Sequence, residues 1–137
     1  QWSRQANIQL WVTSWWGAES REDVTTKEVI LEHPNIGDHK IALFYETTGR
    51  IKEEEEFSTH RVIPDIDYIS TEYFDHPNYF RIDGRPVLFV YLTRKLVAIK
   101  ILEDFIKLMK QAARRSGHDI FIADSYTHMT WPTIHSV

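Results

Sequence analysis

Short apolar runs alternate with amphipathic segments along this chain. Four runs are rich in the β-branched and aromatic residues that favour strands, and they span residues 8–13, 40–46, 87–92 and 120–123. The second and third runs are almost continuously apolar, which is typical of parallel strands buried on both faces. Between the runs, apolar residues recur at intervals of three and four, the spacing that predicts one buried helix face. The pattern therefore predicts strands and helices in alternation.

Three helices are predicted between these strands: over about residues 21–32, from Pro64 onward, and over about residues 95–116. Pro34 ends the first helix, because the residue before a proline avoids the helical conformation. Gly117 is placed to terminate the third. Asp83-Gly84 lies between two apolar segments and predicts a tight β-hairpin. Residues 47–60, which include four consecutive glutamates, are predicted to form a polar loop.

This order predicts an α/β fold with a parallel sheet and right-handed crossovers. Four strands and three helices make about half of a (β/α)8 TIM barrel, whose full length is roughly 250 residues. An open, doubly wound sheet is the alternative, although no strand is followed by a G-x-G-x-x-G or phosphate-binding loop. The chain begins at Gln1 without a signal-peptide pattern and ends at Val137. We expect residues 1–137 to be a single domain that is an internal fragment of a larger barrel.

Composition excludes several classes of function. The 137 residues contain 16 Lys plus Arg against 20 Asp plus Glu, a net charge of −4, with no basic cluster of the kind that binds nucleic acid. No apolar run approaches the ~20 residues of a membrane span. The absence of cysteine excludes disulfides, zinc–thiolate sites and thiol catalysis. The seven histidines form neither a helical i, i+4 pair nor an H-E-x-x-H pattern, so no metal site is predicted.

The aromatic share is 13%, and several aromatic residues stand beside polar ones at the predicted strand ends. Sugar-binding sites have this composition, because pyranose C–H faces stack on aromatic rings while the hydroxyls bind polar groups. The carboxyl ends of the strands carry the active site of an α/β barrel. The candidate substrate-binding residues are therefore Trp15, Trp16, Tyr45, Glu46, Tyr91, Arg94 and Asp124.

The charged candidates each have a structural alternative. Glu46 closes an apolar strand, where its carboxylate can act as acid, base or hydroxyl acceptor, or can pair with Arg50 or Arg94. Arg94 can reach the mouth of the sheet or serve as that partner. Asp124 occupies a similar position at the end of the fourth strand.

The aromatic candidates also leave two interpretations open. Trp15 and Trp16 can form a stacking platform for a sugar or pack at the rim of the barrel, with one residue in each role as a third option. Tyr45 and Tyr91 can each donate a phenolic hydrogen bond to a ligand or to a backbone carbonyl.

Three segments carry a resemblance to a known family. They are Ser14-Trp15-Trp16-Gly17, residues 41–46 (IALFYE) and residues 73–91 (YFDHPNYFRIDGRPVLFVY). Together they resemble glycoside hydrolases of families 71 and 99, the second of which includes the endo-α-mannosidases. The resemblance extends from about Ile8 to Tyr126.

The resemblance implies a (β/α)8 barrel that acts on α-mannosides or related glycans without a cofactor, and it favours the secretory pathway. In the endo-mannosidases the catalytic carboxylates lie late in the barrel, in a W-N-E-W-H-E type segment that this chain lacks. The resemblance therefore assigns Glu46 to sugar binding and leaves the catalytic residues unknown. The alternative is a non-catalytic barrel that recognises glycans or forms a structural subunit of a larger assembly. In either case we expect the rest of the barrel, or partner chains, to cover the edges of strands 8–13 and 120–123.

Overall fold

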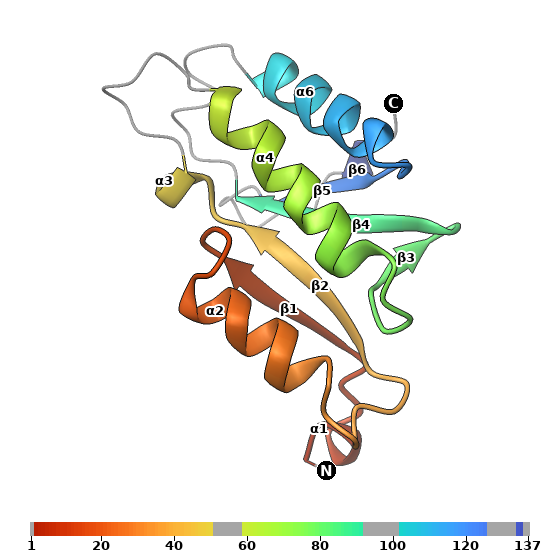
Figure 1. The fold of residues 1–137 in the computed structure, drawn as a ribbon. Coiled ribbons are helices and arrows are strands. Elements are labelled where there is room, and N and C mark those ends of the chain that lie inside the picture. Colours follow the sequence, from red (N-terminus) through yellow and green to blue (C-terminus); the bar gives the residue numbers. More distant parts are fainter. Residues whose placement is uncertain (1, 51–58, 92–101, 126–133, 136–137) are drawn as a thin grey trace.

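The computed structural model describes residues 2–50, 59–91, 102–125 and 134–135 (Figure 1). Its centre is a sheet with the strand order β1-β2-β4-β5-β6, which follows the sequence except that β3 (Arg81–Ile82) lies off this path and pairs with β4 alone. The strands are β1 (Leu10–Trp15), β2 (Lys40–Tyr45), β4 (Arg85–Tyr91), β5 (Phe121–Ser125) and β6 (Ile134–His135). The first four are parallel, and β6 is antiparallel to β5. The predicted α/β class with a parallel sheet is confirmed.

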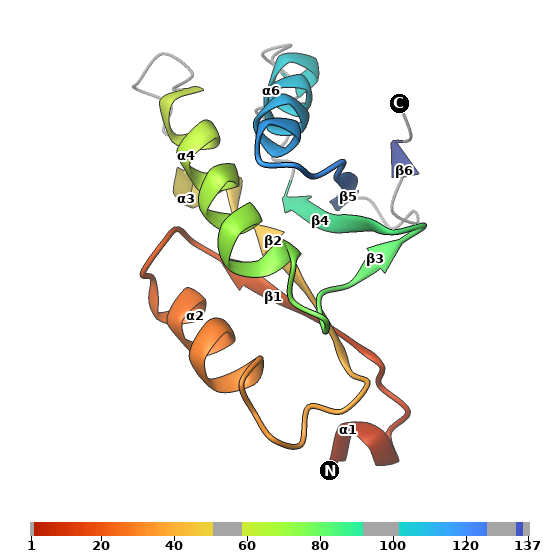
Figure 2. The same ribbon diagram turned by 45° about the vertical axis from the view of Figure 1, so that its right-hand side comes forward.

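The main helices all cover one face of this sheet (Figure 2). The first is α2 (Arg21–Val24) with its π-helical continuation η1 (Thr25–Ile30), the second is α4 (Thr59–Ile69) with η2 (Ser70–Phe74), and the third is α6 (Leu102–Arg115). Right-handed crossovers between successive neighbouring strands place each helix on the same side. Two single turns, α1 (Trp2–Gln5) and α3 (Thr47–Arg50), complete the helical elements of the described part.

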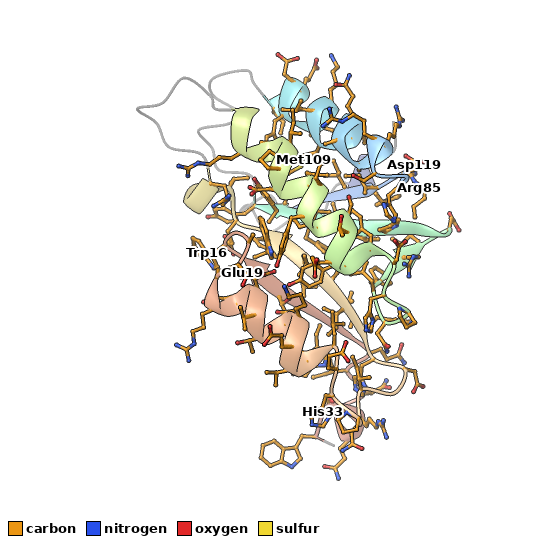
Figure 3. The ribbon with its side chains drawn as sticks, in the orientation of Figure 1. Trp16, Glu19, His33, Arg85, Met109 and Asp119 are labelled. Carbon is orange, nitrogen blue, oxygen red and sulfur yellow. The ribbon has the colours of Figure 1, made fainter. Side chains whose placement is uncertain are left out.

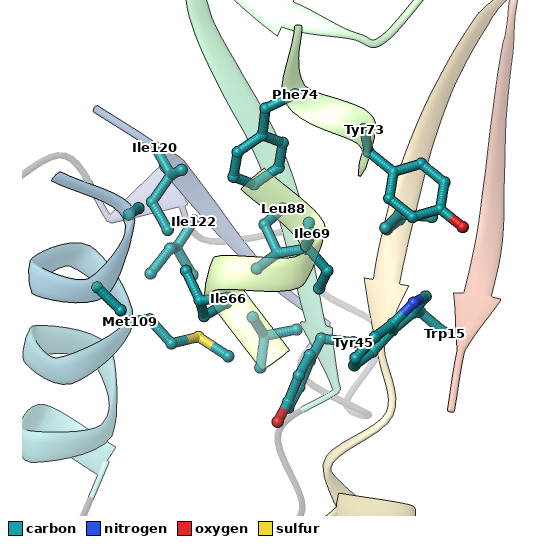
Figure 4. Close-up of a cluster of buried hydrophobic side chains, with 14 of the residues drawn as sticks. Trp15, Tyr45, Ile66, Ile69, Tyr73, Phe74, Leu88, Met109, Ile120 and Ile122 are labelled. Carbon is teal, nitrogen blue, oxygen red and sulfur yellow. The ribbon is translucent and has the colours of Figure 1, made fainter. Parts of the chain in front are cut away.

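The main core lies between the sheet and these helices (Figure 4). Alternate residues of a strand point to opposite faces, so Ile41, Leu43 and Tyr45 of β2 face the helices and are almost completely buried. The largest side chains that join them in the core are Trp15, Ile66, Ile69, Tyr73, Phe74, Leu88, Phe105 and Met109.

A smaller apolar cluster lies on the opposite face of the sheet. Val87 and Phe121 are neighbours in the strand register, and Ala123 lies on the same face as Phe121. Phe80 and Ile82 pack against them from the hairpin that joins β3 (Arg81–Ile82) to β4. That hairpin was predicted from the Asp83-Gly84 pair. Both turn residues have positive φ, 50° and 74°, as a two-residue hairpin turn requires.

The second predicted helix was wrong in its starting point. It begins at Thr59, within the segment predicted as a loop, and Pro64 lies inside it. An internal proline removes one backbone hydrogen bond and costs about 3 kcal/mol. Here Pro64 points to solvent, while Val62 and Ile66 are completely buried on the opposite side of the helix. Packing of this apolar face outweighs the missing bond.

Other boundaries also moved. The first strand extends to Trp15, so Ser14 and Trp15 belong to the strand instead of the loop after it. Residues 47–50, predicted as loop, form α3. The third helix is described from Leu102, and residues 95–101 of the prediction lie outside the described part. Gly117, with φ of +85°, follows α6 as predicted.

The two predicted open edges differ in the structure. Ile122 and Ala123 of β5 pair with β6 of the same chain, so the expected cover by other protein was wrong at this point. The outer edge of β1 has no neighbouring strand among the described residues. Within the same residues, no helix combines the length and apolar character needed to cross a bilayer.

Candidate functional site

The carboxyl ends of β1, β2 and β4 meet at one edge of the sheet, which we call the carboxyl edge. The strand register places Trp15 beside Tyr45, and Tyr45 beside Val90. The residues that follow, namely Trp16, Glu46 and Tyr91, therefore lie at the same level. In barrels and in open parallel sheets alike, ligands bind at the carboxyl ends of the strands.

Glu46 is held by β1. The Ser14 hydroxyl donates a hydrogen bond of 2.8 Å to its Oε1 atom, and the carboxylate is partly exposed. Arg50, one of its two candidate ion-pair partners, binds Asp65 instead, through bonds of 2.8 Å from Nε and 2.6 Å from Nη2. The other candidate partner, Arg94, lies outside the described residues. The Oε2 atom of Glu46 has no hydrogen-bond partner among the described residues, so it can accept a bond from a ligand hydroxyl.

The two tryptophans have different environments. Trp15 is completely buried, stacks on Tyr45 with ring centroids 5.6 Å apart, and donates its indole N–H to Asp23 (Figure 4). Trp16 is 43% exposed at the tip of the loop after β1 (Figure 3). β1 continues through Trp15, and the alternation of side chains along the strand turns the Trp15 ring toward the helices. Stacking by Trp15 on a sugar is thereby corrected to packing, and Trp16 is the one available for a ligand.

The two tyrosines also separate. Tyr45 is completely buried and donates its hydroxyl to Asp65 over 2.7 Å, so it is not available to a ligand. Burial, reinforced by the Asp65 charge, raises the pKa of Tyr45 and keeps it a donor. Tyr91 is partly exposed and packs beside Phe44, and its backbone carbonyl accepts from Thr47. Asp124 lies in β5 opposite Val90, one residue before the level of Tyr91. Its side chain lies outside the described part.

A buried ion pair supports the carboxyl edge from below. Asp65, only 4% exposed, receives Tyr45 and both nitrogens of the Arg50 fork. The hydrogen bond to Asp65 raises the pKa of Arg50 above its usual value. The guanidinium also lies 5.7 Å from the centre of the Trp15 ring. The two bonds from Arg50 to Asp65 have the bidentate geometry in which arginine holds carboxylates. They fix α3 to α4 at the base of the site.

A second buried carboxylate, Asp23, ties β1 to the second helix, α4 with η2. It accepts hydrogen bonds from the Trp15 indole (2.9 Å), the Glu19 amide (2.9 Å), the Tyr68 hydroxyl (2.6 Å) and the Tyr73 hydroxyl (2.5 Å). Burial on its own would raise the pKa of Asp23, but these four donors outweigh it and hold the pKa below its usual value. Asp23 is therefore a structural carboxylate, ionised at neutral pH.

The structural roles of Asp23 and of the Arg50–Asp65 pair were not predicted. Ser20-x-x-Asp23 carries a helix-start pattern, and Ser20 does accept from the Asp23 amide over 3.2 Å. The donors from Tyr68 and Tyr73 come from far along the chain, where no local pattern marks them. Among the residues that the structure describes, no group of three or more His, Asp or Glu side chains is placed to hold a metal ion.

Comparisons of this chain with protein-family models, with curated proteins and with solved structures found no match. The resemblance to glycoside hydrolase families 71 and 99 therefore stays a prediction from the sequence. The geometry of the carboxyl edge carries the functional argument.

Gly17 offers a test of the Arg50–Asp65 support. A Cβ at Gly17 would lie 2.7 Å from Arg50 Nη1, whereas one at Gly84 would meet nothing within 4 Å. Gly84→Ala is a control for a positive φ without a clash and should cost about 1 kcal/mol, although the φ of Gly17, 127°, lies further from the left-handed helical region than the 74° of Gly84. Gly17→Ala should cost about 1–2 kcal/mol more in the free energy of unfolding, because Arg50 must move away from Asp65.

Chemical denaturation of both variants measures this difference. The same comparison in an Arg50→Ala background isolates the clash, since the part that depends on Arg50 disappears there. Equal costs for the two glycine substitutions in the wild-type background would contradict the arrangement.

Proposed function

We propose that the carboxyl edge binds a glycan of the α-mannoside type, with the chain forming part of a (β/α)8 barrel of the glycoside hydrolase kind. The observation that carries this proposal is the position of Glu46. Ser14 orients its carboxylate at the end of a buried strand, and Trp16, whose ring is 43% exposed, follows the neighbouring strand at the same level of the sheet. A carboxylate that accepts from sugar hydroxyls, beside an aromatic face for the C–H surface, is the pairing that carbohydrate recognition requires.

The topology supports the barrel part of the proposal. Sequential parallel strands with the helices on one face are the arrangement of consecutive β/α units in a barrel. A doubly wound sheet would instead place helices on both faces. The resemblance of residues 73–91 to families 71 and 99 supports the choice of glycan.

Binding is the role proposed for these residues. Hydrolysis of a glycoside by either stereochemical route needs two carboxyl groups around the scissile bond. Among the described carboxylates near the carboxyl edge, Asp23 and Asp65 are enclosed by protein donors, and Glu19 accepts from Tyr68 and pairs with Lys27. Glu46, which ends its strand, is the carboxylate that we assign to substrate contact. A non-catalytic glycan-binding barrel uses the same contacts, and it differs from a hydrolase only in releasing no product from an α-mannosyl oligosaccharide.

Trp16→Ala tests the proposed stacking. We expect this variant to bind α-mannosyl oligosaccharides about tenfold more weakly than wild type, as the loss of one aromatic contact of about 1–1.5 kcal/mol implies. Its melting temperature should stay within a few degrees, because the ring is already 43% exposed. Isothermal titration calorimetry gives the affinity directly.

Trp2→Ala is the matched control, since Trp2 is 86% exposed on α1, at the other end of the sheet (Figure 1). It should bind like wild type. Equal loss in both variants, or no loss in Trp16→Ala, would remove Trp16 from the site.

A further inference from the structure

The loop that carries Trp16 contains a residue in an unfavourable backbone conformation. Residues 16–20 join β1 to α2, and within them Glu19 has a φ of +61°. The other non-glycine residues with positive φ in the described part are Asn7 and Asp83, which belong to the two types that tolerate this conformation best. A glutamate in the left-handed region persists only where the surrounding structure holds it.

A closed ring of polar contacts holds Glu19 in place. Lys27 Nζ donates to the Tyr68 hydroxyl over 2.8 Å, and this hydroxyl donates to Asp23 Oδ2 over 2.6 Å. The same Oδ2 atom accepts from the Glu19 backbone N–H over 2.9 Å. The ring closes where the Glu19 carboxylate lies 3.6 Å from Lys27 Nζ. Glu19 is therefore held through its backbone and its side chain at once.

Lys27 is the group that ties this ring to the second helix. Its hydrogen bond to Tyr68 raises the pKa of Lys27 above its usual value, so the ammonium is charged. Burial raises the pKa of Tyr68 to about 12, so the Tyr68 hydroxyl keeps the proton that it donates. The ammonium also lies 3.7 Å from Glu72 Oε2. An isolated exposed ion pair with Glu19 would hold the loop weakly, but Lys27 is anchored on α4 and η2 as well.

The other side of the loop is held too. Gly17 is buried, and a Cβ there would lie 2.7 Å from Arg50 Nη1, so its backbone lies against the guanidinium that Asp65 fixes. The Ser20 amide donates to the Gly17 carbonyl over 3.2 Å. Trp16 therefore projects from backbone that is held on both sides, with its ring 43% exposed (Figure 3).

We propose that Lys27 is a positioning residue for the carboxyl edge. Through Tyr68 and Glu19 it holds the loop of residues 16–20, and with it the Trp16 ring, in the conformation that stacks on a sugar. The inference rests on the proposed function for the identity of the ligand, whereas the order of the loop is a property of the free protein. A loop that is already ordered loses little conformational freedom when a ligand binds, and releasing it transfers that loss to the binding step.

Backbone ¹⁵N relaxation of the free chain, followed by glycan titration of the same samples, tests the proposal. Lys27→Met keeps the apolar stem and removes the ammonium, and Asp23 keeps all four of its donors. We expect amide order parameters of residues 17–19 near the ~0.85 of rigid backbone in wild type, falling toward ~0.6 in Lys27→Met. The affinity for an α-mannosyl oligosaccharide should fall about threefold to tenfold.

Lys107→Met is the matched control, because the Lys107 side chain is 68% exposed on α6 and pairs only within that helix among the described residues. It should match wild type in both measurements. If Lys27→Met fails to fold, Glu19→Ala decides in its place, since the Glu19 side chain is 74% exposed, and it should loosen the same loop. Unchanged loop order in the folded variant would overturn the proposal.

A double-mutant cycle with Trp16→Ala separates positioning from a merely structural role. If Lys27 acts through Trp16, adding Lys27→Met to Trp16→Ala should weaken glycan binding no further. An equal additional loss in both backgrounds would overturn the proposal, as would a loosened loop with unchanged affinity. A wild-type chain that binds no α-mannosyl glycan would contradict the proposed function. The relaxation data would then decide the role of Lys27 alone, with loosening of residues 17–19 supporting it.

Discussion

Asp23→Asn is expected to lower the melting temperature of this chain by about 10–15 °C. The buried Asp23 carboxylate accepts from four donors, and a carboxamide presents an N–H₂ group to some of them. A hydrogen bond to a charged group contributes about 1.5–3 kcal/mol, and a buried donor left without an acceptor costs about 1–3 kcal/mol. A combined loss of about 3–5 kcal/mol is a large part of the stability of a domain this size.

The effect has a defined pH dependence. The folded protein holds the pKa of Asp23 below its usual value of 3.8, so the stabilisation is fully present above that value. It is lost as the pH falls through the lower, folded-state pKa. Thermal melts of wild type and Asp23→Asn should therefore differ most near neutral pH and converge in acid. Asp38→Asn, at an exposed position, is the control and should melt like wild type; a similar melt for Asp23→Asn would contradict the buried network.

Glu46→Gln is expected to lose glycan affinity, or turnover in a complete enzyme, by about tenfold to a hundredfold. A charge-assisted bond to a sugar hydroxyl contributes about 1.5–3 kcal/mol, and each 1.4 kcal/mol is a factor of ten. The variant should still melt within a few degrees of wild type, because the glutamine carbonyl can accept from Ser14 in the same position.

Calorimetric titration and a thermal melt of the same Glu46→Gln sample separate the two roles of this residue. Ser14→Ala should reduce affinity less, since it removes the group that orients the carboxylate and keeps the charge. A Glu46→Gln protein that unfolds early but binds normally per folded molecule would show that Glu46 serves structure alone.

The strands were the most predictable elements of this fold. Residues 40–45 and 85–91 form central parallel strands. After the first residue of each, the sequence is continuously apolar, which is typical of a strand buried on both faces. The Asp83-Gly84 turn was predictable for a similar reason, because both positions need positive φ. In each case the determining contacts are local or depend on burial alone.

The buried polar networks were not predictable in this way. Whether Tyr45 reaches a ligand depends on Asp65, which lies twenty residues further along the chain. Glu46 pairs with Ser14 and not with Arg50, although Arg50 is four residues away in sequence, because Asp65 binds both nitrogens of the Arg50 fork. Helix boundaries were also missed where tertiary packing overrode a local signal, as at Pro64.

Amide chemical-shift mapping of the isotope-labelled chain during titration with an α-mannosyl oligosaccharide tests the central claim most directly. The account predicts saturable shifts that cluster at the carboxyl edge, on Ser14, Trp16, Glu46 and Tyr91, and that need about ten to a hundred times more glycan to saturate in Glu46→Gln. The amino-terminal end of the sheet, around Lys40 and Arg81, should remain unchanged. Shifts confined to that end, or none at saturating glycan, would contradict the assignment of glycan binding to the carboxyl edge.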